Sequence, residues 1–508
     1  MFCSNAYLSG MRSHFLVAAA HSGAGKTTVT LGLLRAFQRQ GLHVQPFKCG
    51  PDYIDPIHHR TAAGRDSINL DGYMMSPGHI DELYARYSAE ADVCITEGVM
   101  GLFDGSRKNE GSSASLAISL GLPVILVLNA KAMAYSAAAI LFGLKNFDPR
   151  LRIAGVIFNF VDSPSHYRLL EEACQDVGVK ALGHLPANNA LRIPSRHLGL
   201  DTANADEAIE AAASHLSRHI DLTALLTATR MPDPPTVSAP DRASNPPDPT
   251  GMPAPDSTGM PAPDPTGISA PGPDHTHAPK KARSILVAHD AAFHFLYPEN
   301  IRRLEQWGHV RYFSPLHDTQ LPLADLIYLP GGYPELYLET LSNNISLLNA
   351  LRHFRGKILA ECGGMMFLGK SITDANGKVW PMTGLLDIAT SIEKKKLTLG
   401  YRRVQWKEDT IKGHEFHYSQ LIGPPAAITD PIAAASSAPI AAAITAPTAA
   451  PSSAPITAPS PGSAPVPSVF NSQDLPVDTP IFHQPRLLAT YMHFYWGENA
   501  RFLREWLD

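Results

Sequence analysis

The sequence predicts an α/β protein with two domains, each built around a mainly parallel sheet. Short apolar runs rich in β-branched residues alternate with helical patterns, which is typical of parallel sheets covered by helices on both faces. This alternation extends from residue 14 to about residue 222 and begins again near residue 283. The chain has 508 residues, more than one ordinary domain uses. Two hydrophobic cores are therefore expected.

The first domain is predicted over residues 12–228. Its expected strands are "HFLVAAA", "HVQPFK", "DVCITEG", "PVILVLNA" and "IAGVIFNF". The apolar segment "AMAYSAAAILFGL", between Lys131 and Lys145, is well short of the roughly 20 residues that a membrane-spanning helix needs. We expect it to form a helix that packs on the sheet.

Two low-complexity tracts divide the rest of the chain. Residues 229–282 contain "PDPTGMPA", "PDSTGMPA" and "PDPTGISA" in tandem, and residues 422–479 are rich in Ala, Pro, Ser and Thr. Such compositions cannot bury a core, so we predict a disordered Pro-rich linker and a disordered insertion. The second domain is predicted over residues 283–508, and its expected strands include "SILVAHD", "DLIYLPGG" and "KILAECGG".

Charge and cysteine content narrow the range of partners. The net charge is −5 and charged residues make up 18% of the chain, so no strong basic field favours nucleic acid or a membrane surface. The five cysteines are widely spaced and form no CxxC pair, which argues against disulfides and structural zinc. We therefore expect a cytoplasmic location, and we read no signal peptide at the N-terminus.

The stretch "AAAHSGAGKTTVTLGLLRAF" has the features of a phosphate-binding loop. It follows a strand and opens an amphipathic helix, as such a loop must. Its glycines let backbone amides converge on phosphate oxygens, and its lysine supplies a cation. Ala20 stands where the usual pattern has its first glycine, so the prediction rests on SGAGKTT and its setting. The predicted nucleotide-binding residues are Gly23, Gly25, Lys26, Thr27, Thr28 and Asn159.

Acidic residues follow two other strands of this domain, in "FKCGPDYIDPIHH" and "EGVMGLFDG". The carboxyl ends of parallel strands are where open α/β sheets bind ligands, and magnesium prefers oxygen ligands beside phosphates. We predict that Thr27, Asp52 and Glu97 hold Mg²⁺. The residues predicted to contact substrate are Tyr53, Asp55 and Asp104. The alternative is that these loop acids are solvated or cap helices.

"ILAECGGMMFLG" places Cys362 between an apolar strand and a helix. Such a turn would expose the sulfur and let backbone amides lower its pKa, as a nucleophile requires, although a lone Cys is more often a buried packing residue. "LPGGYPE" and the residue after the cysteine predict Gly332 and Gly363 as backbone donors to an oxyanion. His417 and His493 are the candidate bases for the thiol proton.

Six motifs, taken together and in order, resemble the cobyrinate a,c-diamide synthase family, which includes the hydrogenobyrinate and nickel-sirohydrochlorin amidases. They are "SGAGKTT", "FKCGPDYIDPIHH", "EGVMGLFDG", "PGGYPE", "AECGGMMFLG" and "GHEFHYSQ". The resemblance covers nearly all of the chain outside the two tracts. It implies an ATPase domain similar to dethiobiotin synthetase, joined to a class I glutamine amidotransferase domain.

The resemblance also implies roles. Cys362 would be the nucleophile and His493 the general base, with ATP and glutamine as co-substrates, Mg²⁺ as cofactor and a cobyrinate-like tetrapyrrole as acceptor. The sequence does not give the oligomeric state and leaves a homodimer open. Triad amidotransferases carry a glutamate two residues beyond the histidine, but this chain has Tyr495 there. The family then implies a Cys-His pair, and another group must orient the imidazole.

Two alternatives stay open on the sequence. One is a cobyric acid synthase, a related amidase of other corrin side chains, although that family is not expected to contain "GPDYIDP". The other is a P-loop regulatory protein with a degenerate amidotransferase tail, against which the retained Cys362 and His493 speak. The metal of the tetrapyrrole is not decided by the sequence, because it depends on the shape of the pocket.

Overall fold

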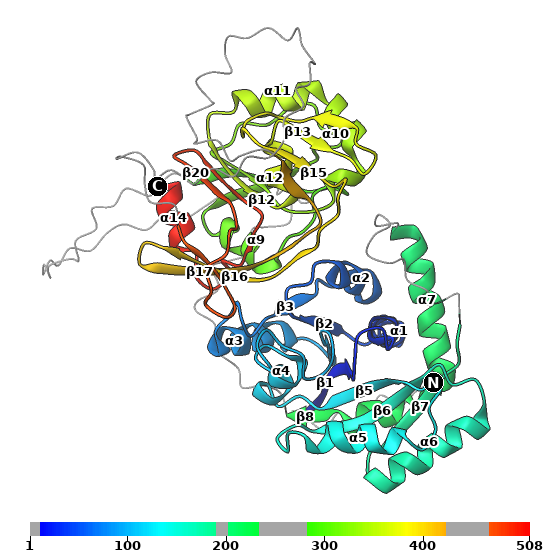
Figure 1. The fold of residues 1–508 in the computed structure, drawn as a ribbon. Helices are drawn as coiled ribbons and strands as arrows, with labels where there is room; N and C mark the ends of the chain where they lie inside the picture. The colour runs from blue at the N-terminus through cyan, green and yellow to red at the C-terminus, as the bar shows by residue number, and fades with distance from the viewer. Residues whose placement is uncertain (1–10, 189–190, 192–201, 233–281, 423–466) are drawn as a thin grey trace, which may run out of the picture.

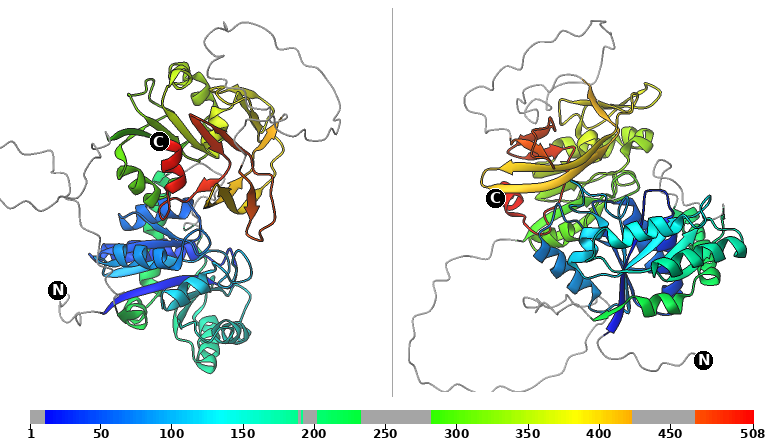
Figure 2. Two further views of the ribbon diagram at one scale, coloured as in Figure 1. Left: turned by 90° about the vertical axis from the view of Figure 1, so that its left-hand side faces the viewer. Right: turned by 60° about the horizontal axis from the view of Figure 1, so that its bottom comes forward.

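A computed structural model of the protein describes residues 11–188, 191, 202–232, 282–422 and 467–508. Two α/β units lie against each other, each with its own parallel sheet (Figures 1 and 2). The first unit runs from blue to green in Figure 1 and the second from green to red.

The first unit is built on an eight-stranded sheet with strand order β3-β2-β4-β1-β5-β6-β7. All of these strands are parallel, and β8 adds an antiparallel pairing to β1. Its elements are β1 (Met11–Ala19), α1 (Lys26–Arg39), β2 (Val44–Cys49), α2 (Ile54–Ala63), β3 (Ile68–Leu70), α3 (Pro77–Ser88), β4 (Val93–Glu97), α4 (Ser113–Ser119), β5 (Val124–Asn129), α5 (Ala137–Asn146), β6 (Ile153–Asn159), α6 (Pro164–Val177), β7 (Ala181–Leu185), α7 (Thr202–His219), α8 (Leu222–Ala228) and β8 (Arg230–Pro232).

Helices cover both faces of this sheet, because successive side chains of its strands point to opposite sides. Phe15 and Val17 of β1 belong to a buried cluster with side chains of α1 and α7. Leu16 and Ala18 belong to another, with side chains of α3, α4, α5 and α6. The apolar strands of the sequence therefore form a two-sided core, and the five strands predicted for this domain are confirmed.

The second unit has a six-stranded sheet with strand order β10-β9-β11-β12-β21-β20, in which only the β20–β21 pairing is antiparallel among its described pairings. Two four-stranded sheets lie beside it. Its elements are β9 (Arg283–Ala288), α9 (Pro298–Glu305), β10 (Gly308–Phe313), β11 (Leu326–Leu329), the 3₁₀ turn η2 (Pro334–Leu336), α10 (Leu338–Asn343), α11 (Ile345–His353), β12 (Lys357–Glu361), α12 (Gly363–Leu368), β13 (Ser371–Thr373), β14 (Val379–Pro381), β15 (Ala389–Ser391), β16 (Thr398–Trp406), β17 (Asp409–His417), β18 (Gln420–Ile422), β19 (Val469–Asn471), β20 (Ile481–Gln484), β21 (Leu487–Thr490), β22 (His493–Phe494) and α14 (Arg501–Leu507).

The two tracts predicted to be disordered each include a short strand near one end, so their predicted bounds are too wide. β8, within the predicted linker, pairs with β1, and β19, within the predicted insertion, pairs with β16. These short segments join sheets because their backbone groups complete ladders at strands far away in sequence, which composition does not reveal. The central parts of both tracts, residues 233–281 and 423–466, lie outside the described residues.

The apolar segment predicted to pack as a helix is α5, and it is only partly covered. Ala137 and Leu141 are buried, whereas Phe142 is 60% exposed. In the described part of the chain, no helix combines the length and the apolar character needed to cross a membrane.

The two units share an interface that is both polar and apolar. Ser76 N donates to Glu498 at 2.9 Å, and the Tyr401 hydroxyl donates to Asp71 at 2.8 Å. Phe295 and Tyr297 of the second unit belong to the same buried cluster as Leu16 of the first. In Figure 1, α2, β3 and α3 face α9, β16 and β17 across this interface. The core on one side of the first sheet thus continues into the second unit.

Candidate active site

The phosphate-loop sequence forms the turn between β1 and α1. Gly23 and Gly25 have φ values of 82° and 99°, which L side chains rarely adopt. A Cβ atom on Gly25 would lie 2.2 Å from Nδ2 of Asn159. That nitrogen donates to the Ala24 carbonyl at 3.0 Å. Asn159, at the end of β6, therefore holds the loop through its backbone at Ala24.

Lys26 and Thr27 begin α1, followed by the half-buried Thr28. Nζ of Lys26 donates to the Met100 carbonyl at 2.6 Å, and burial lowers the pKa of this lysine. The Thr27 hydroxyl donates to Oε1 of Glu97 at 2.6 Å. This bond joins the first turn of α1 to the end of β4. Thr27 and Glu97 are therefore close enough to bind the same ligand.

Glu97 is buried within a wider network that the sequence did not predict. Its Oε2 is hydrogen-bonded to Nε2 of His59 at 2.7 Å, and the other nitrogen of His59 lies 2.9 Å from the Ser67 hydroxyl. Lys48 Nζ lies 3.6 Å from Oε1 of Glu97. His59 lies within the quoted "IHH" segment, but sequence alone does not show which of two adjacent histidines turns inward.

Lys48 brings three of the predicted acids together. Its Nζ is 2.7 Å from Asp55 and 3.9 Å from Asp52, and Glu97 completes the group. Burial disfavours the Lys48 ammonium, but these carboxylates outweigh it and raise the pKa of the lysine. The sequence did contain a signal for this pairing, because a lysine in a buried strand such as "HVQPFK" is rare unless a carboxylate pairs with it. Lys48 neutralises negative charge that would otherwise be costly to bury.

The predicted magnesium ligands fit a metal unequally. Thr27 and Glu97 present two hard oxygen atoms in contact at the phosphate loop, which suits Mg²⁺. Asp52 instead caps α2 with Oδ1, which accepts from Ile54 N at 2.8 Å. The described residues contain no group of three or more His, Cys, Asp or Glu side chains placed to hold a metal ion. A metal here would therefore rely on Thr27, Glu97 and phosphate oxygens.

The predicted substrate residues occupy three different environments. Asp55 is buried against Lys48, and Asp104 lies in an exposed loop where it accepts from Gly101 N at 2.9 Å. Tyr53 is only 8% exposed, and its ring lies among aromatic side chains of the second unit. Of the three, Asp104 alone has an exposed side chain in this structure.

Cys362 lies at a strained turn between β12 and α12. Its φ of 46° and ψ of −107° are unusual for a residue with a side chain, and the strain of such a turn is on the order of 1–3 kcal/mol. Its amide donates to the Thr490 carbonyl at 2.7 Å. The expectation of an exposed, acidified thiol is wrong for this state, since Cys362 is 3% exposed and burial, together with Glu335, raises its pKa. The thiol therefore needs a base to remove its proton.

The two predicted oxyanion donors lie next to this turn. A Cβ atom built on Gly363 would lie 3.2 Å from the amide nitrogen of Gly332. The neighbouring Gly331 packs on His493, since a Cβ there would lie 2.3 Å from Cε1 of the imidazole. The "PGGYPE" loop thus touches both the cysteine turn and the predicted base. Gly331 and Gly332 are required there because a Cβ atom at either position would clash with neighbouring atoms.

His493 is the deeply buried histidine on the short strand β22, and His417 lies elsewhere. Nδ1 of His493 has no hydrogen-bond partner among the described residues, and burial lowers the pKa of the imidazole well below its usual value. His417 stacks on Tyr491 with ring centroids 3.8 Å apart, and its Nδ1 lies 2.9 Å from the Ser419 carbonyl. His493 is therefore held by packing, and His417 by a local hydrogen bond.

Glu361 was missed by the sequence interpretation, although it precedes Cys362 directly. Its two oxygens accept from the Tyr328 hydroxyl at 2.8 Å and from Phe494 N at 3.1 Å. Burial raises its pKa to about 8. Phe494 follows His493, so Glu361 connects the cysteine turn to the backbone that carries the predicted base. The signal that could have revealed it is the presence of a glutamate in the apolar run "ILAECGG".

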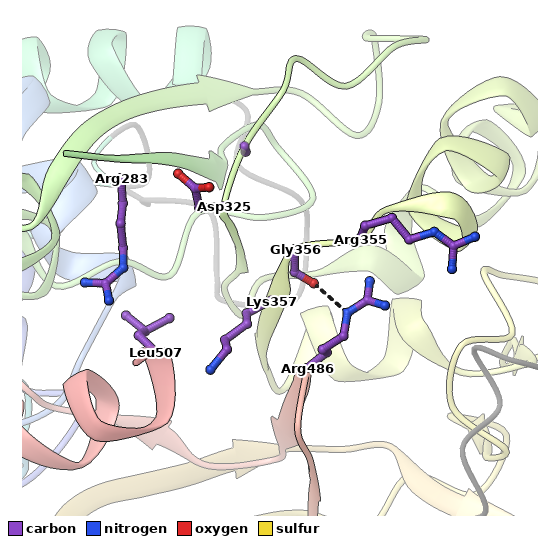
Figure 3. A pocket seen from close by; sticks show the side chains of 8 residues that line it. Arg283, Asp325, Arg355, Gly356, Lys357, Arg486 and Leu507 are labelled. Carbon is purple, nitrogen blue, oxygen red and sulfur yellow. Dashed lines mark hydrogen bonds between the residues drawn. The ribbon is translucent and has the colours of Figure 1, made fainter. Parts of the chain in front are cut away.

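A pocket of about 380 Å³ lies where β9 and β12 begin, at the sheet edge opposite to the one that carries Cys362 (Figure 3). Three of the four cations that line it have partners: Arg283 pairs with Asp508, Lys357 donates to the Trp506 carbonyl, and Arg486 donates to the Phe354 carbonyl at 2.7 Å. Figure 3 shows Arg355 and Arg486 directed to one side and Arg283 and Lys357 to another, so their charges do not converge. These side chains stabilise the strand ends.

Two family models match the chain. One, described as a CobQ/CobB/MinD/ParA nucleotide binding domain, matches residues 15–200. The other, described as a CobB/CobQ-like glutamine amidotransferase domain, matches residues 284–433. The first contains the phosphate loop, and the second contains the Cys362 turn.

Curated relatives match most of the chain. A cobyrinate a,c-diamide synthase from Salmonella typhimurium is 38% identical over 82% of this chain and 87% of its own length. A hydrogenobyrinate a,c-diamide synthase from Rhodobacter capsulatus is 40% identical over 81% of this chain and 90% of its own length. A cobyrinate a,c-diamide synthase from Caldanaerobacter subterraneus subsp. tengcongensis is 36% identical over 80% of this chain and 87% of its own length.

Proposed function

The chain belongs to the family of cobyrinate and hydrogenobyrinate a,c-diamide synthases, and we propose that it uses ATP and glutamine to amidate the a and c acetate groups of cobyrinate, or of a closely related tetrapyrrole, in cobalamin biosynthesis. The observation that carries this proposal is the presence, in one chain, of a phosphate loop whose Thr27 bonds Glu97 and of a strained cysteine turn and a buried histidine that both adjoin the Gly331–Gly332 loop. The cysteine site would supply the ammonia that the phosphate-loop site consumes.

In the second unit, the chain would release ammonia from glutamine. His493 removes the thiol proton of Cys362, the sulfur attacks the side-chain amide of glutamine, and the amides of Gly332 and Gly363 stabilise the oxyanion. The proton then passes to the leaving nitrogen, and ammonia departs as a glutamyl thioester forms. Water hydrolyses the thioester, which restores the thiol and yields glutamate. Burial lowers the pKa of His493 and so keeps the imidazole neutral, the form that can take the thiol proton, while it also weakens the imidazole as a base.

In the first unit, the chain would activate a carboxylate of the tetrapyrrole. The γ-phosphoryl group of ATP is transferred to a carboxylate oxygen, which gives an acyl phosphate and ADP. Ammonia then displaces phosphate and forms the amide. Gly23, Gly25 and Lys26 would hold the phosphates, and Thr28 lies in the same first helical turn. Asn159 would act by supporting the loop, because its amide bonds Ala24.

Magnesium would be held by Thr27 and Glu97, whose oxygens meet at the phosphate loop. When bound, it would neutralise charge on the phosphate oxygens. The chain's own residues orient this pair, because His59 fixes the second oxygen of Glu97. Asp52 would act mainly through α2, which it caps, and Asp104 remains as the exposed candidate for contact with the tetrapyrrole.

The test is the product mass after incubation with ATP and glutamine and, in parallel, cobyrinate, hydrogenobyrinate or nickel-sirohydrochlorin. Amidation replaces a carboxylic acid by an amide, so each step lowers the mass by about 1 Da, and two steps identify the diamide. Loss of glutamate release in Cys362→Ala would also exclude a purely regulatory P-loop protein. Amidation of none of the three substrates, by a folded protein that hydrolyses glutamine, would contradict the proposal.

We further propose that the protein is a homodimer and that helix α5 contributes to the contact. Phe142 is 60% and Phe147 is 74% exposed, and a second copy that covered these large apolar side chains would remove them from water. Light scattering of the wild type and of Phe142→Glu/Phe147→Glu tests this: the wild type should have twice the monomer mass and the variant should be monomeric.

A cytoplasmic location without nucleic-acid or membrane partners is also proposed, supported by the net charge of −5, and is tested by cell fractionation.

A further inference from the structure

We propose that Tyr53, from the phosphate-loop unit, is a positioning residue for His493, so that the glutaminase site is complete only when both units are in contact. This inference rests on the proposed role of His493 as the general base. Tyr495 stands where the usual glutamate would orient the imidazole, so another group must orient it.

Among the described residues, no carboxylate holds Nδ1 of the imidazole, the nitrogen that a triad glutamate would bind. Nδ1 of His493 is buried and has no hydrogen-bond partner among the described residues. Tyr495, which occupies the position of the usual glutamate, directs its hydroxyl to Nε2 of His79 in the first unit, at 2.8 Å. Glu361 holds the backbone through Phe494 N rather than the ring itself. The orientation of the ring must therefore come from packing.

Aromatic rings surround the imidazole. His414 stacks on it, with ring centroids 4.9 Å apart and an interplanar angle of 18°. Tyr53 packs against it at 5.2 Å and Phe295 at 5.9 Å, while the backbone of Gly331 closes another side. Of these neighbours, Tyr53 comes from the other unit. Removing it would leave a gap beside the imidazole that water or a different rotamer could fill.

Tyr53 is itself firmly held. Its ring stacks on Phe295 at 5.0 Å with an interplanar angle of 4°, and it packs on Tyr297 at 4.6 Å. It is the residue that precedes α2, whose N-terminus is capped by Asp52, and Asp55 in the first turn pairs with Lys48 at 2.7 Å. The network around the phosphate loop therefore fixes the position from which Tyr53 reaches His493.

The surroundings of His493 keep it neutral. The titratable groups that face it are His414 on β17, which packs on it, Tyr53 before α2, and His417, whose charge would also disfavour protonation. None of these supplies a negative charge at neutral pH. Loss of the Tyr53 ring would admit water, and hydration would move the pKa of the imidazole back toward its ordinary value.

The experiment measures kcat/KM for glutamine hydrolysis against pH in the full-length protein, with glutamate release as the readout. Tyr53→Leu removes the aromatic ring but keeps the interface apolar, and Tyr53→Phe keeps the ring. We expect Tyr53→Leu to lower kcat/KM by about tenfold or more, since small displacements of a general base are costly. We also expect its acidic limb to move to higher pH, and Tyr53→Phe to restore most of the activity.

Gly331→Ala is a second, independent variant, because its Cβ would push the imidazole from the other side. It should reproduce the loss of kcat/KM, and its Cβ would also lie 3.2 Å from Cδ2 of Phe295 at the interface between the units. Folded Tyr53→Leu and Gly331→Ala proteins with wild-type rates and pH profiles would overturn the inference. If His493→Ala itself retained glutaminase activity, the assigned base would be wrong, which is a failure of the proposed function and distinct from a failure of this inference.

Discussion

The Thr27 hydroxyl donates a hydrogen bond of 2.6 Å to Glu97, which joins the first turn of the helix after the phosphate loop to the end of a strand three strands later in the chain. The second oxygen of Glu97 is fixed by His59. This geometry gives Glu97 one orientation before any ligand binds, because both of its carboxylate oxygens are hydrogen-bonded.

Glu97→Gln should lower ATP-dependent amidation by about a hundredfold or more, because it removes the anionic ligand beside Thr27. Glutaminase activity should survive, since Cys362 lies in the other unit. Glu90→Gln is the matched control, as Glu90 is exposed. Steady-state assays of both half-reactions check this, and equal loss of both in a folded Glu97→Gln protein would count against the placement.

Lys48→Met should destabilise the first unit by about 3–5 kcal/mol, because it leaves the buried carboxylates of Asp55 and Glu97 without their compensating charge. Urea unfolding followed by fluorescence measures the loss. Adding the Asp55→Asn change should recover part of it, since one uncompensated charge is then removed. A loss below about 1 kcal/mol, the range of exposed ion pairs, would show that the pair is solvated.

Cys362→Ala should abolish glutamine-dependent amidation, by more than about a thousandfold, and spare amidation with ammonium salts. The reason is that the variant removes the nucleophile and leaves the phosphate loop untouched. Cys174→Ala, at a buried cysteine of α6, is the control and should retain both reactions. Failure of ammonium salts to rescue a folded Cys362→Ala protein would mean that the two units do not divide the work in this way.

Glu361→Gln should make the protein less sensitive to alkaline pH. The pKa of Glu361 is raised to about 8 in the folded state, above its unfolded value, so its contribution to stability is complete below the unfolded pKa and is lost as pH rises through about 8. A single such group gives a slope of up to about 1.4 kcal/mol per pH unit. Unfolding midpoints of wild type and variant between pH 5 and 9 measure it. Parallel profiles would show that Glu361 is ionised in the folded protein.

Shortening residues 233–281 to a flexible linker that still spans the units, and replacing residues 423–466 by a short Gly/Ser loop, should change the rate of diamide formation by less than about threefold. Extending the first deletion to residue 229 should also remove β8 and lower the unfolding temperature, because β8 pairs with β1. Rates and thermal unfolding of both variants check this. A folded short variant that hydrolyses glutamine without amidating would show that these segments help to transfer ammonia.

The sequence predicted much of the fold and the chemistry of each site. Apolar strand runs, the glycine-rich loop and the cysteine between a strand and a helix are local patterns, and local backbone geometry follows from adjacent residues. The positive φ values of Gly25 and Cys362 are examples, because the turns that need them are encoded within a few positions. The family motifs then linked the two sites to one reaction.

The sequence by itself determined which elements form and which side chains carry the chemistry, whereas the tertiary structure decided their surroundings. Burial of Cys362, the pairing of Lys48 with three acids and the contact of Tyr53 with His493 were not predicted. β8 and β19 likewise take their place only through partners elsewhere in the chain. The physical reason is that desolvation, charge pairing and ring packing depend on residues far apart in sequence, whose contacts exist only after both units have folded and met.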